Sequence, residues 1–206
     1  MIQIFTGHAG IGGDPLLDAM YRDRKHVFID LLKWDVPVLR GIYELDQFDN
    51  EDAIYLVAGN RNGEHLGSIR LLPTIGAHLL GSVFPNLCDG PVPSGLDIME
   101  ISRGCLSTRL RARERLIIRN KLTTAVVAYA LGRGVRQLSC IADAGWYSQI
   151  LALGWDCRPL GLPRRLAGSM TGALAINVTA DTPRLLLEAG SYEPAELVER
   201  YKEQMA

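Results

Sequence analysis

An arginine inside an apolar helical stripe is the feature that most constrains how this chain can fold. Apolar residues recur at helical spacing between positions 17 and 31, which predicts a helix over residues 15–32. Arg24 falls within that stripe rather than on the polar face. Because an unpaired charge is costly to bury, the fold must supply carboxylates, and the nearest in sequence are Glu44, Asp46 and Asp49.

Length and composition indicate one globular domain. With 206 residues, of which 48% are hydrophobic and 22% charged, the chain can bury a substantial core, and we expect a single domain over residues 1–206. The formal net charge of -1 gives no global field that would attract nucleic acid, so we expect no nucleic-acid partner. Charge is nevertheless uneven, because residues 109–121 are basic and residues 44–52 are acidic.

Cysteine and histidine usage argues against a metal site. The four cysteines are far apart without a CxxC pair, and the four histidines are scattered, so we expect no zinc and reduced thiols in the cytoplasm. The first residues lack a basic region followed by an apolar run, and no stretch of about eighteen apolar residues occurs, so we expect no membrane partner. The cysteines are Cys88, Cys105, Cys140 and Cys157.

Strand-like and helical segments alternate along the chain, which predicts an α/β fold with a mixed, twisted sheet flanked by helices. The predicted strands cover residues 2–5, 53–58, 66–72, 97–106, 137–142, 155–160 and 173–178. The predicted helices cover residues 15–32, 77–83, 113–132 and 146–153, with further helical segments in 182–206. Between them we expect a glycine-rich loop at 10–13, an irregular segment at 34–49 and turns at 161–168.

Two of the predicted strands carry charged residues that are unusual in a protein core. Alternation along 66–72 puts Leu66, Ser68 and Arg70 on one face, so either that face is solvated or Arg70 points into a cleft. In 97–106, Glu100 and Arg103 are three residues apart and would lie on opposite faces unless a bulge near residue 104 intervenes. Taken singly, each charge could instead form a surface ion pair worth about 0 to 1 kcal/mol.

Taken together, these charges and the nearby aromatic residues suit a substrate that is both zwitterionic and cationic. Arginine can grip a carboxylate through two hydrogen bonds, acids can hold an ammonium group, and aromatic faces can receive a purine or a sulfonium. A structural ion network would use the same residue types, so this alternative stays open. The residues concerned are Arg24, Phe28, Trp34, Asp46, Asp49, Arg70, Glu100 and Arg103.

The spacing of these residues resembles the motif series of the acyl-homoserine-lactone synthases, which make quorum-sensing signals. The matching motifs are Arg24-x-x-x-Phe28, Trp34, Glu44-x-Asp46-x-Phe48-Asp49, Arg70-Leu71-Leu72-Pro73-Thr74, Phe84-Pro85 and Glu100-x-Ser102-Arg103, and the resemblance extends to Gly154-Trp155. It implies an α-β-α sandwich similar to the GNAT acyltransferases. It also implies S-adenosylmethionine as the amine donor, an acyl carrier protein or acyl-CoA as the second substrate, and no separate cofactor.

The resemblance also implies roles for individual residues. The implied catalytic set is Arg24, Asp46, Asp49, Arg70, Glu100 and Arg103, and the implied S-adenosylmethionine contacts are Phe28, Trp34, Ser102 and Arg103. Glu100 would be the general base that deprotonates the amine, directly or through a water, with a backbone carbonyl near Ser102 as the alternative. Glu100 could instead only neutralise arginines, and Phe28 could only pack in the core.

For the acyl group, the resemblance points to Met99, Cys140, Trp146 and Leu153. Cys140 occupies the place where members similar to 3-oxoacyl users carry threonine, and a thiol is a poorer hydrogen-bond donor, so a 3-oxo group is disfavoured. Trp146 falls where methionine is common. We therefore expect a short, branched or aromatic acyl group, unless Trp146 is only a packing residue of its helix.

A basic run could dock the carrier, although such a run is commonly just a solvated helix face. Its candidates are Arg109, Arg111, Arg115 and Arg119. Residues 103–108 do not match the phosphate-binding loop of GNAT enzymes, so the carrier stays open. The competing interpretations are a GNAT N-acyltransferase that acylates another amine, and a non-enzymatic binding domain with salt-sensitive affinity for nucleic acid.

Overall fold

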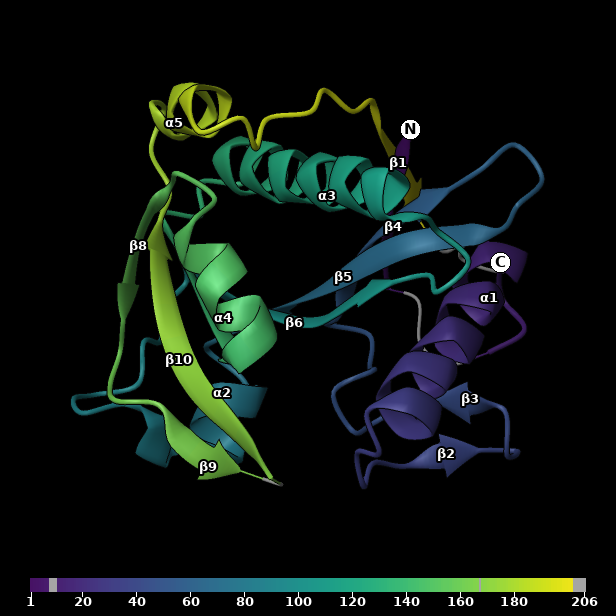
Figure 1. Cartoon of the computed structure of the whole chain (residues 1–206), viewed down its shortest axis with the longest axis horizontal. Coiled ribbons are helices and arrows are strands. Elements are labelled where there is room, and N and C mark those ends of the chain that lie inside the picture. The colour runs from purple at the N-terminus through teal and green to yellow at the C-terminus, as the bar shows by residue number, and fades with distance from the viewer. Residues whose placement is uncertain (8–10, 167, 202–206) are drawn as a thin grey trace. The chain divides into compact units, whose positions relative to one another are not determined.

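The structure is a computed structural model in which residues 1–7, 11–166 and 168–201 are described (Figure 1). The chain forms two compact units, each assembled from separate stretches of sequence. The first comprises Met1–Leu71, Arg103–Ala125 and Pro194–Ala206, and the second comprises Leu72–Ser102 and Val126–Glu193. The expectation of a single domain stays a prediction.

The strands of the first unit pair in the order β11-β1-β4-β5. β1 is parallel to β11 and antiparallel to β4, and β4 and β5, at the predicted strands 53–58 and 66–72, pair as an antiparallel hairpin. A separate two-stranded ladder joins β2 to β3. The bounds are β1 Ile2–Thr6, β2 Val38–Leu39, β3 Tyr43–Glu44, β4 Ile54–Gly59, β5 His65–Pro73 and β11 Leu197–Tyr201.

The first helix is shorter than predicted and changes its winding. α1 spans Pro15–Arg24, with the Asp14 side chain accepting hydrogen bonds from the amides of Leu16 and Leu17 at its start. The chain then continues as a π-helix, η1 (Lys25–Leu31), in place of the predicted α-helix to residue 32. A π-helix keeps residues three to five apart on one side, so apolar spacing alone could not distinguish it.

Two helices cover opposite faces of the first unit's sheet. A Cβ added at Gly67 of β5 would lie 2.8 Å from side-chain atoms of both Leu106 and Ile118, which places the beginning of α3 (Ala112–Gly132) directly on that residue. Alternation turns Arg70 to the other face, the side of its ion-pair partners Asp46 and Asp49. Figure 1 shows α3 on one side of β4 and β5 and α1 on the other.

In the second unit the strands pair in the order β6-β7-β10-β8, with β9 also on β10. β6 is parallel to β7, and the pairs of β10 with β7, β8 and β9 are antiparallel. The strand bounds are β6 Ile98–Leu106, β7 Gln137–Asp143, β8 Asp156–Pro159, β9 Arg164–Leu166 and β10 Ser169–Asn177. The other elements are α2 Leu79–Ser82, the 3-10 helix η2 Pro85–Leu87, α4 Ala144–Leu151 and α5 Thr182–Glu188.

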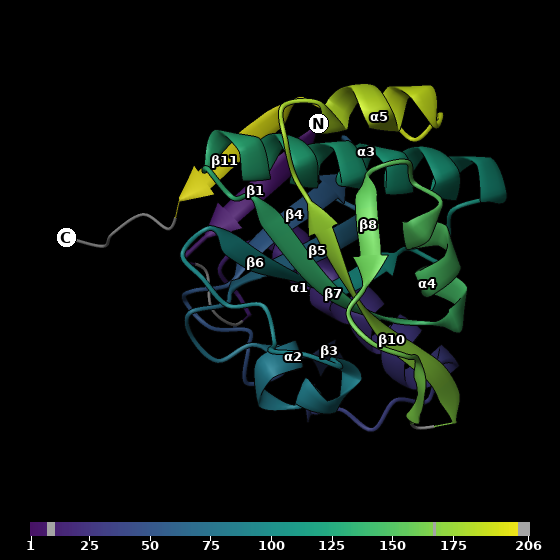
Figure 2. The ribbon, with the colours of Figure 1, turned by 90° about the vertical axis from the view of Figure 1, so that its left-hand side faces the viewer.

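The second unit's sheet is also covered on both faces. A Cβ at Gly172 of β10 would lie 2.5 Å from the Tyr147 ring of α4, whereas the next residue, Ala173, belongs to a buried cluster with Leu80 and Leu87 of α2 and η2. Successive strand residues point to opposite faces, so α4 covers one face and α2 with η2 the other. Figure 2 shows β7, β10 and β8 side by side, with α4 next to them.

The predicted mixed α/β class with helices flanking a mixed sheet is confirmed. Three further segments differ from prediction, because residues 34–49 contain β2 and β3, residues 161–166 contain β9, and the described residues 182–201 contain one helix followed by β11. The helical pattern of the sequence ends at Pro194. Among the described residues, the short run 197–201 forms a strand by pairing with β1. Gly10 lies outside the described residues. Among the described helices, none is long and apolar enough to cross a membrane.

Candidate active site

Arg24 is buried with carboxylates, as its place in the apolar stripe predicts. Its side chain is 1% exposed, and its Nη1 and Nη2 donate to the two oxygens of Asp49 at 2.8 Å each. Its Nε donates to Glu44 at 2.6 Å. Asp46, the third predicted partner, instead accepts from other arginines. The fork of Arg24 therefore joins α1 to the acidic segment 44–49.

Arg70 and Arg103 reach the same acidic segment from two strands. Arg70 donates to Asp46 at 2.6 and 3.1 Å and lies 2.8 Å from Asp49. Arg103 donates to Glu44 at 3.0 Å and lies 2.6 Å from Asp46. The first unit thus buries three arginines against three carboxylates, a balanced set that avoids the cost of an unpaired buried charge.

The expected irregularity in β6 lies at Arg103 itself. Its φ of 51° is in the left-handed region, which side-chain-bearing residues seldom adopt and which interrupts the regular alternation of the strand. Such strain persists where the surrounding structure enforces it, and it is concentrated at functional sites. The sequence pointed to residue 104, one position away, because glycine is the residue that tolerates this conformation best.

Burial and ion pairing act differently on the network's pKa values. Burial alone would lower the pKa of Arg24, but Asp49 and Glu44 more than offset it and raise that pKa. Burial alone would raise the pKa of Asp49, yet Arg24 and Arg70 hold it well below its usual range. For Arg103, burial wins and lowers the pKa despite Glu44. Arg103 is therefore the network arginine whose charge the fold compensates least.

Two aromatic residues stack beside Arg103. The rings of Phe28 and Trp34 are 4.7 Å apart at an angle of 6°, and the Arg103 guanidinium carbon lies 5.6 and 5.9 Å from their centroids. The amide of Trp34 donates to the carbonyl of Phe28 at 2.8 Å, which holds the turn after η1. Phe28 is buried and Trp34 is 36% exposed, so the stack is exposed to solvent on its Trp34 side.

Two tyrosines extend the network and were not predicted. The Tyr55 hydroxyl donates to Asp49 at 2.9 Å, and burial followed by the Asp49 charge raises the pKa of this tyrosine. Burial and then Asp49 raise the pKa of Tyr21 to about 12. Tyr55 is the register partner of Arg70, so the hairpin pairing, rather than any motif, reveals its role.

Glu100, in the second unit, is fully buried and is held by backbone amides. One carboxylate oxygen accepts from the amide of Leu79 at 2.8 Å and the other from that of Leu80 at 2.6 Å. Both donors begin α2, so Glu100 points to the α2 face of the sheet. Amide donors stabilise and orient a carboxylate. Ser102, two residues further along β6, is also buried.

The predicted acyl-pocket residues lie on the opposite face from Glu100. Cys140 pairs in register with Leu174, which by alternation shares the face of Gly172 and hence of α4. Met99, next to Glu100, points to this face as well. Trp146 is half-buried on α4 itself, and Leu153 is buried just after that helix. Cys140 and Met99 therefore lie on the face of the sheet that carries α4, and Cys140 is deeply buried.

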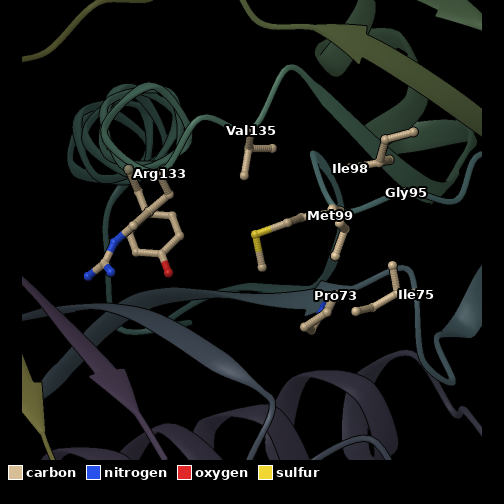
Figure 3. A pocket seen from close by; sticks show the side chains of 9 residues that line it. Pro73, Ile75, Gly95, Ile98, Met99, Arg133 and Val135 are labelled. Carbon is tan, nitrogen blue, oxygen red and sulfur yellow. The ribbon is translucent and has the colours of Figure 1, made fainter.

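Met99 also lines a pocket of about 190 Å3 in the second unit (Figure 3). The figure shows its side chain extending between Val135 and Pro73. The other lining residues are Ile75, Gly95, Leu96, Ile98, Tyr129 and Arg133. Cys140, Trp146 and Leu153 do not line this pocket.

Three of the four arginines proposed for carrier docking have bonds inside the protein. Arg109 donates to both oxygens of Asp23 at 2.8 and 3.0 Å. Arg115 donates to the carbonyls of residues 106 and 107, and Arg119 to the side chain of residue 120. Arg111 is exposed. Of these three, Arg109 is paired with an acidic residue, whereas these bonds of Arg115 and Arg119 go to neutral groups.

Arg109, itself half exposed, completes a second charge cluster that sequence reasoning missed. Its guanidinium also donates to the carbonyl of His65 at 2.8 Å, and the His65 Nδ1 lies 2.8 Å from Asp23. Burial alone would raise the pKa of Asp23, but hydrogen bonds from His65 and Arg109 lower it to about 2. Burial lowers the pKa of His65, with Asp23 opposing. Among the residues with described positions, no cluster could hold a metal ion.

Comparison with known proteins identifies relatives along almost the whole chain. Residues 14–184 match the family described as autoinducer synthase. An acyl-homoserine-lactone synthase of Rhizobium etli is 32% identical over 208 residues, which cover 96% of this chain and 97% of that protein. The structure of the CoA-dependent acyl-homoserine lactone synthase BjaI with SAM and isopentyl-CoA has a TM-score of 0.83 at 26% identity, covering 97% of this chain and 93% of that one.

A more distant structure shows the same fold in another class of protein. A protein of Lactobacillus plantarum assigned as an N-acetyltransferase has a TM-score of 0.56 at 16% identity, covering 87% of this chain and 98% of that chain. At that identity only the fold is shared. The GNAT-like α-β-α sandwich expected from the sequence is confirmed by this likeness together with that to BjaI.

Replacing Arg24 with methionine should destabilise the protein severely. The substitution leaves Glu44 and Asp49 buried without their principal cation, which costs about 3 to 5 kcal/mol of unfolding free energy. Urea denaturation of Arg24→Met and wild type measures the difference. The matched control is Arg184→Met, whose partners are exposed, and its unfolding midpoint should stay near that of wild type. Equal midpoints for both variants would contradict a stabilising network.

The buried His65 should make stability fall as the pH drops below about 6.5. Its folded pKa is depressed, so in this range the unfolded chain binds a proton that the folded protein does not, and unfolding becomes easier by up to about 1.4 kcal/mol per pH unit. Denaturant titrations between pH 7.5 and 5 measure the slope. His65→Gln should flatten it, whereas His26→Gln, at an exposed position, should not; a slope unchanged by His65→Gln would contradict the assignment.

Proposed function

Since this chain belongs to the autoinducer synthase family and is an acyl-homoserine-lactone synthase, we propose that its buried arginine network holds the methionine part of S-adenosylmethionine. The enzyme is an acyltransferase that forms an N-acyl-L-homoserine lactone from S-adenosylmethionine and an acyl thioester and releases methylthioadenosine. What remains to be assigned is how its own residues divide that work.

The position of Arg103 carries this proposal. It is the network arginine with the least compensated charge, it adopts a left-handed backbone conformation, and it lies against the Phe28 and Trp34 rings. A substrate carboxylate would add to the compensation that Glu44 and Asp46 give, through guanidinium N–H groups other than the Nε–H that bonds Glu44. Arg24 and Arg70 are more fully paired, and they act by holding the acidic segment in place.

The aromatic stack is assigned to the sulfonium and adenosine end of the substrate. Trp34 has one exposed face, which a purine can cover, and aromatic faces attract a cationic sulfonium. Asp46 and Asp49 are both paired with arginines, so we assign them to the framework rather than to direct contact with the substrate ammonium. S-adenosylmethionine is a substrate here, and no separate cofactor is required.

The chemistry proceeds through two bond exchanges. The substrate ammonium loses a proton, and its nitrogen attacks the thioester carbonyl, forming the amide bond while the carbon–sulfur bond breaks and the thiol leaves with a proton. The methionine carboxylate then attacks the γ-carbon, closing the lactone as the bond to the sulfonium breaks and methylthioadenosine leaves. Overall, one proton is released per turnover. We assign the removal of the ammonium proton to Glu100, directly or through one water.

We propose a CoA thioester with a short, branched or aromatic acyl group as the acyl donor. The similarity to BjaI, whose structure was determined with isopentyl-CoA, supports this choice. So do the buried Cys140, a poor donor toward a 3-oxo group, and the bulky Trp146 on α4. We place the reaction in the cytoplasm, in keeping with four free thiols.

Turnover assays on purified protein test the proposed function. With S-adenosylmethionine and a panel of acyl-CoA and acyl-carrier thioesters, mass spectrometry should detect methylthioadenosine and lactone in equal amounts, with acyl-CoA preferred. Arg103→Ala should raise the KM for S-adenosylmethionine at least tenfold, and Glu100→Gln should lower kcat at least tenfold, both remaining folded by circular dichroism. Full activity in both variants would contradict the site, and acylation of another amine without methylthioadenosine would indicate a general N-acyltransferase.

The size of the Trp146 side chain should set the acyl preference. Trp146→Ala is expected to shift the chain-length profile by at least two carbons toward longer acyl groups, because it opens space on the face that α4 covers. Competition assays with mixed acyl-CoA substrates measure the profile. Ser148→Ala, an exposed position on the same helix, is the control. An unchanged profile in Trp146→Ala would mean that Trp146 only packs its helix.

A further inference from the structure

The two amides that hold Glu100 belong to the first turn of a very short helix. Leu79 and Leu80 begin α2, which has only four residues, so its own hydrogen bonds cannot fix where these amides point. The Leu80 side chain is fully buried in the cluster with Leu87 and Ala173, which anchors α2 to the sheet. The direction of the amides therefore depends on contacts outside the helix, including those of the N-cap residue that precedes it.

That residue is His78, which is held by its backbone carbonyl and by one edge of its ring. Its carbonyl accepts the amide of Ser82 at 2.9 Å, and its Nδ1 lies 2.9 Å from the carbonyl of Gly76. Because a carbonyl can only accept, Nδ1 carries a proton and donates this bond. Nε2 is buried and, among the residues with described positions, has no hydrogen-bond partner, so packing rather than polarity decides where this edge lies.

The buried edge of the His78 ring rests on Gly81. A Cβ built at Gly81 would lie 2.6 Å from the ring Cε1 and 2.7 Å from Nε2, closer than real Cβ atoms approach. The ring is only 5% exposed, and it cannot swing away without losing the bond to Gly76. Only glycine at position 81 leaves room for the ring, so His78 and Gly81 are sterically matched.

We propose that His78 is a positioning residue for the reaction: seated on Gly81 and bonded to Gly76, its ring fixes the turn whose amides orient Glu100. His78 acts through Glu100 and has no contact with substrate. This inference rests on the proposed role of Glu100 as the base. It predicts that disturbing the ring slows the chemical step while leaving the affinity for S-adenosylmethionine intact.

Alanine at Gly81 tests the seat without removing a functional side chain. Gly81→Ala should lower kcat at least tenfold and change the KM for S-adenosylmethionine less than twofold. The matched control is Gly90→Ala, in a loop of the same unit where an added Cβ meets nothing within 4 Å, and its kinetics should stay within twofold of wild type. A wild-type kcat in Gly81→Ala would overturn the proposal.

Substitutions of His78 separate positioning from simple loss of structure. His78→Ala should match Gly81→Ala, whereas His78→Asn should recover at least half of the wild-type kcat, because its side-chain amide can donate to the Gly76 carbonyl as Nδ1 does. Equal loss in the alanine and asparagine variants, or a KM that rises as kcat falls, would overturn the proposal.

A double-mutant cycle distinguishes failure of this inference from failure of the proposed function. If His78 acts through Glu100, His78→Ala should lower the kcat of Glu100→Gln by less than twofold. If Glu100→Gln is slow but His78→Ala reduces kcat by its full factor in both backgrounds, this inference fails and the base assignment survives. If Glu100→Gln is fully active, the base assignment fails, and the inference that depends on it fails too.

Discussion

The burial of three guanidinium groups against three carboxylates is the constraint on which the rest of the first unit depends. The arginines come from three separate elements, α1, β5 and β6, but the carboxylates all come from the short segment 44–49. Each arginine alone would be too costly to bury, so all three elements must meet at that one segment. A segment with little regular structure is thereby fixed as firmly as a strand, and the Arg103 guanidinium is brought beside the Phe28 and Trp34 rings.

Sequence reasoning could predict the network because charge in an apolar stripe has few solutions. The misplaced Arg24 pointed to Glu44 and Asp49, and both are its partners. Asp46 was expected to pair with Arg24 but pairs with Arg70 and Arg103. This pairing depends on strand register and on the left-handed backbone conformation of Arg103, and residue spacing reveals neither. The hold on Glu100 escaped prediction for another reason: its partners are backbone amides, which leave no trace in residue identity.

The parts of the fold that were missed share one cause. β11 is stabilised by pairing with β1, almost two hundred residues away, and β9 by pairing with β10, so neither has a strong local signal. The π-helix η1 keeps the apolar spacing of the α-helix that precedes it. Helices and hairpins whose signals are local were predicted to within a few residues, as the β4–β5 hairpin and α3 illustrate.

The central claim is that the arginine network is a binding site and not only a structural device. Calorimetric titration of S-adenosylmethionine into wild type and Arg103→Lys tests it most directly, because lysine keeps the charge of the network but loses the planar edge offered to a carboxylate and the stack on two aromatic rings. The account predicts binding at least tenfold weaker in Arg103→Lys, with an unfolding midpoint near that of wild type. Undiminished affinity in a folded Arg103→Lys variant would contradict it.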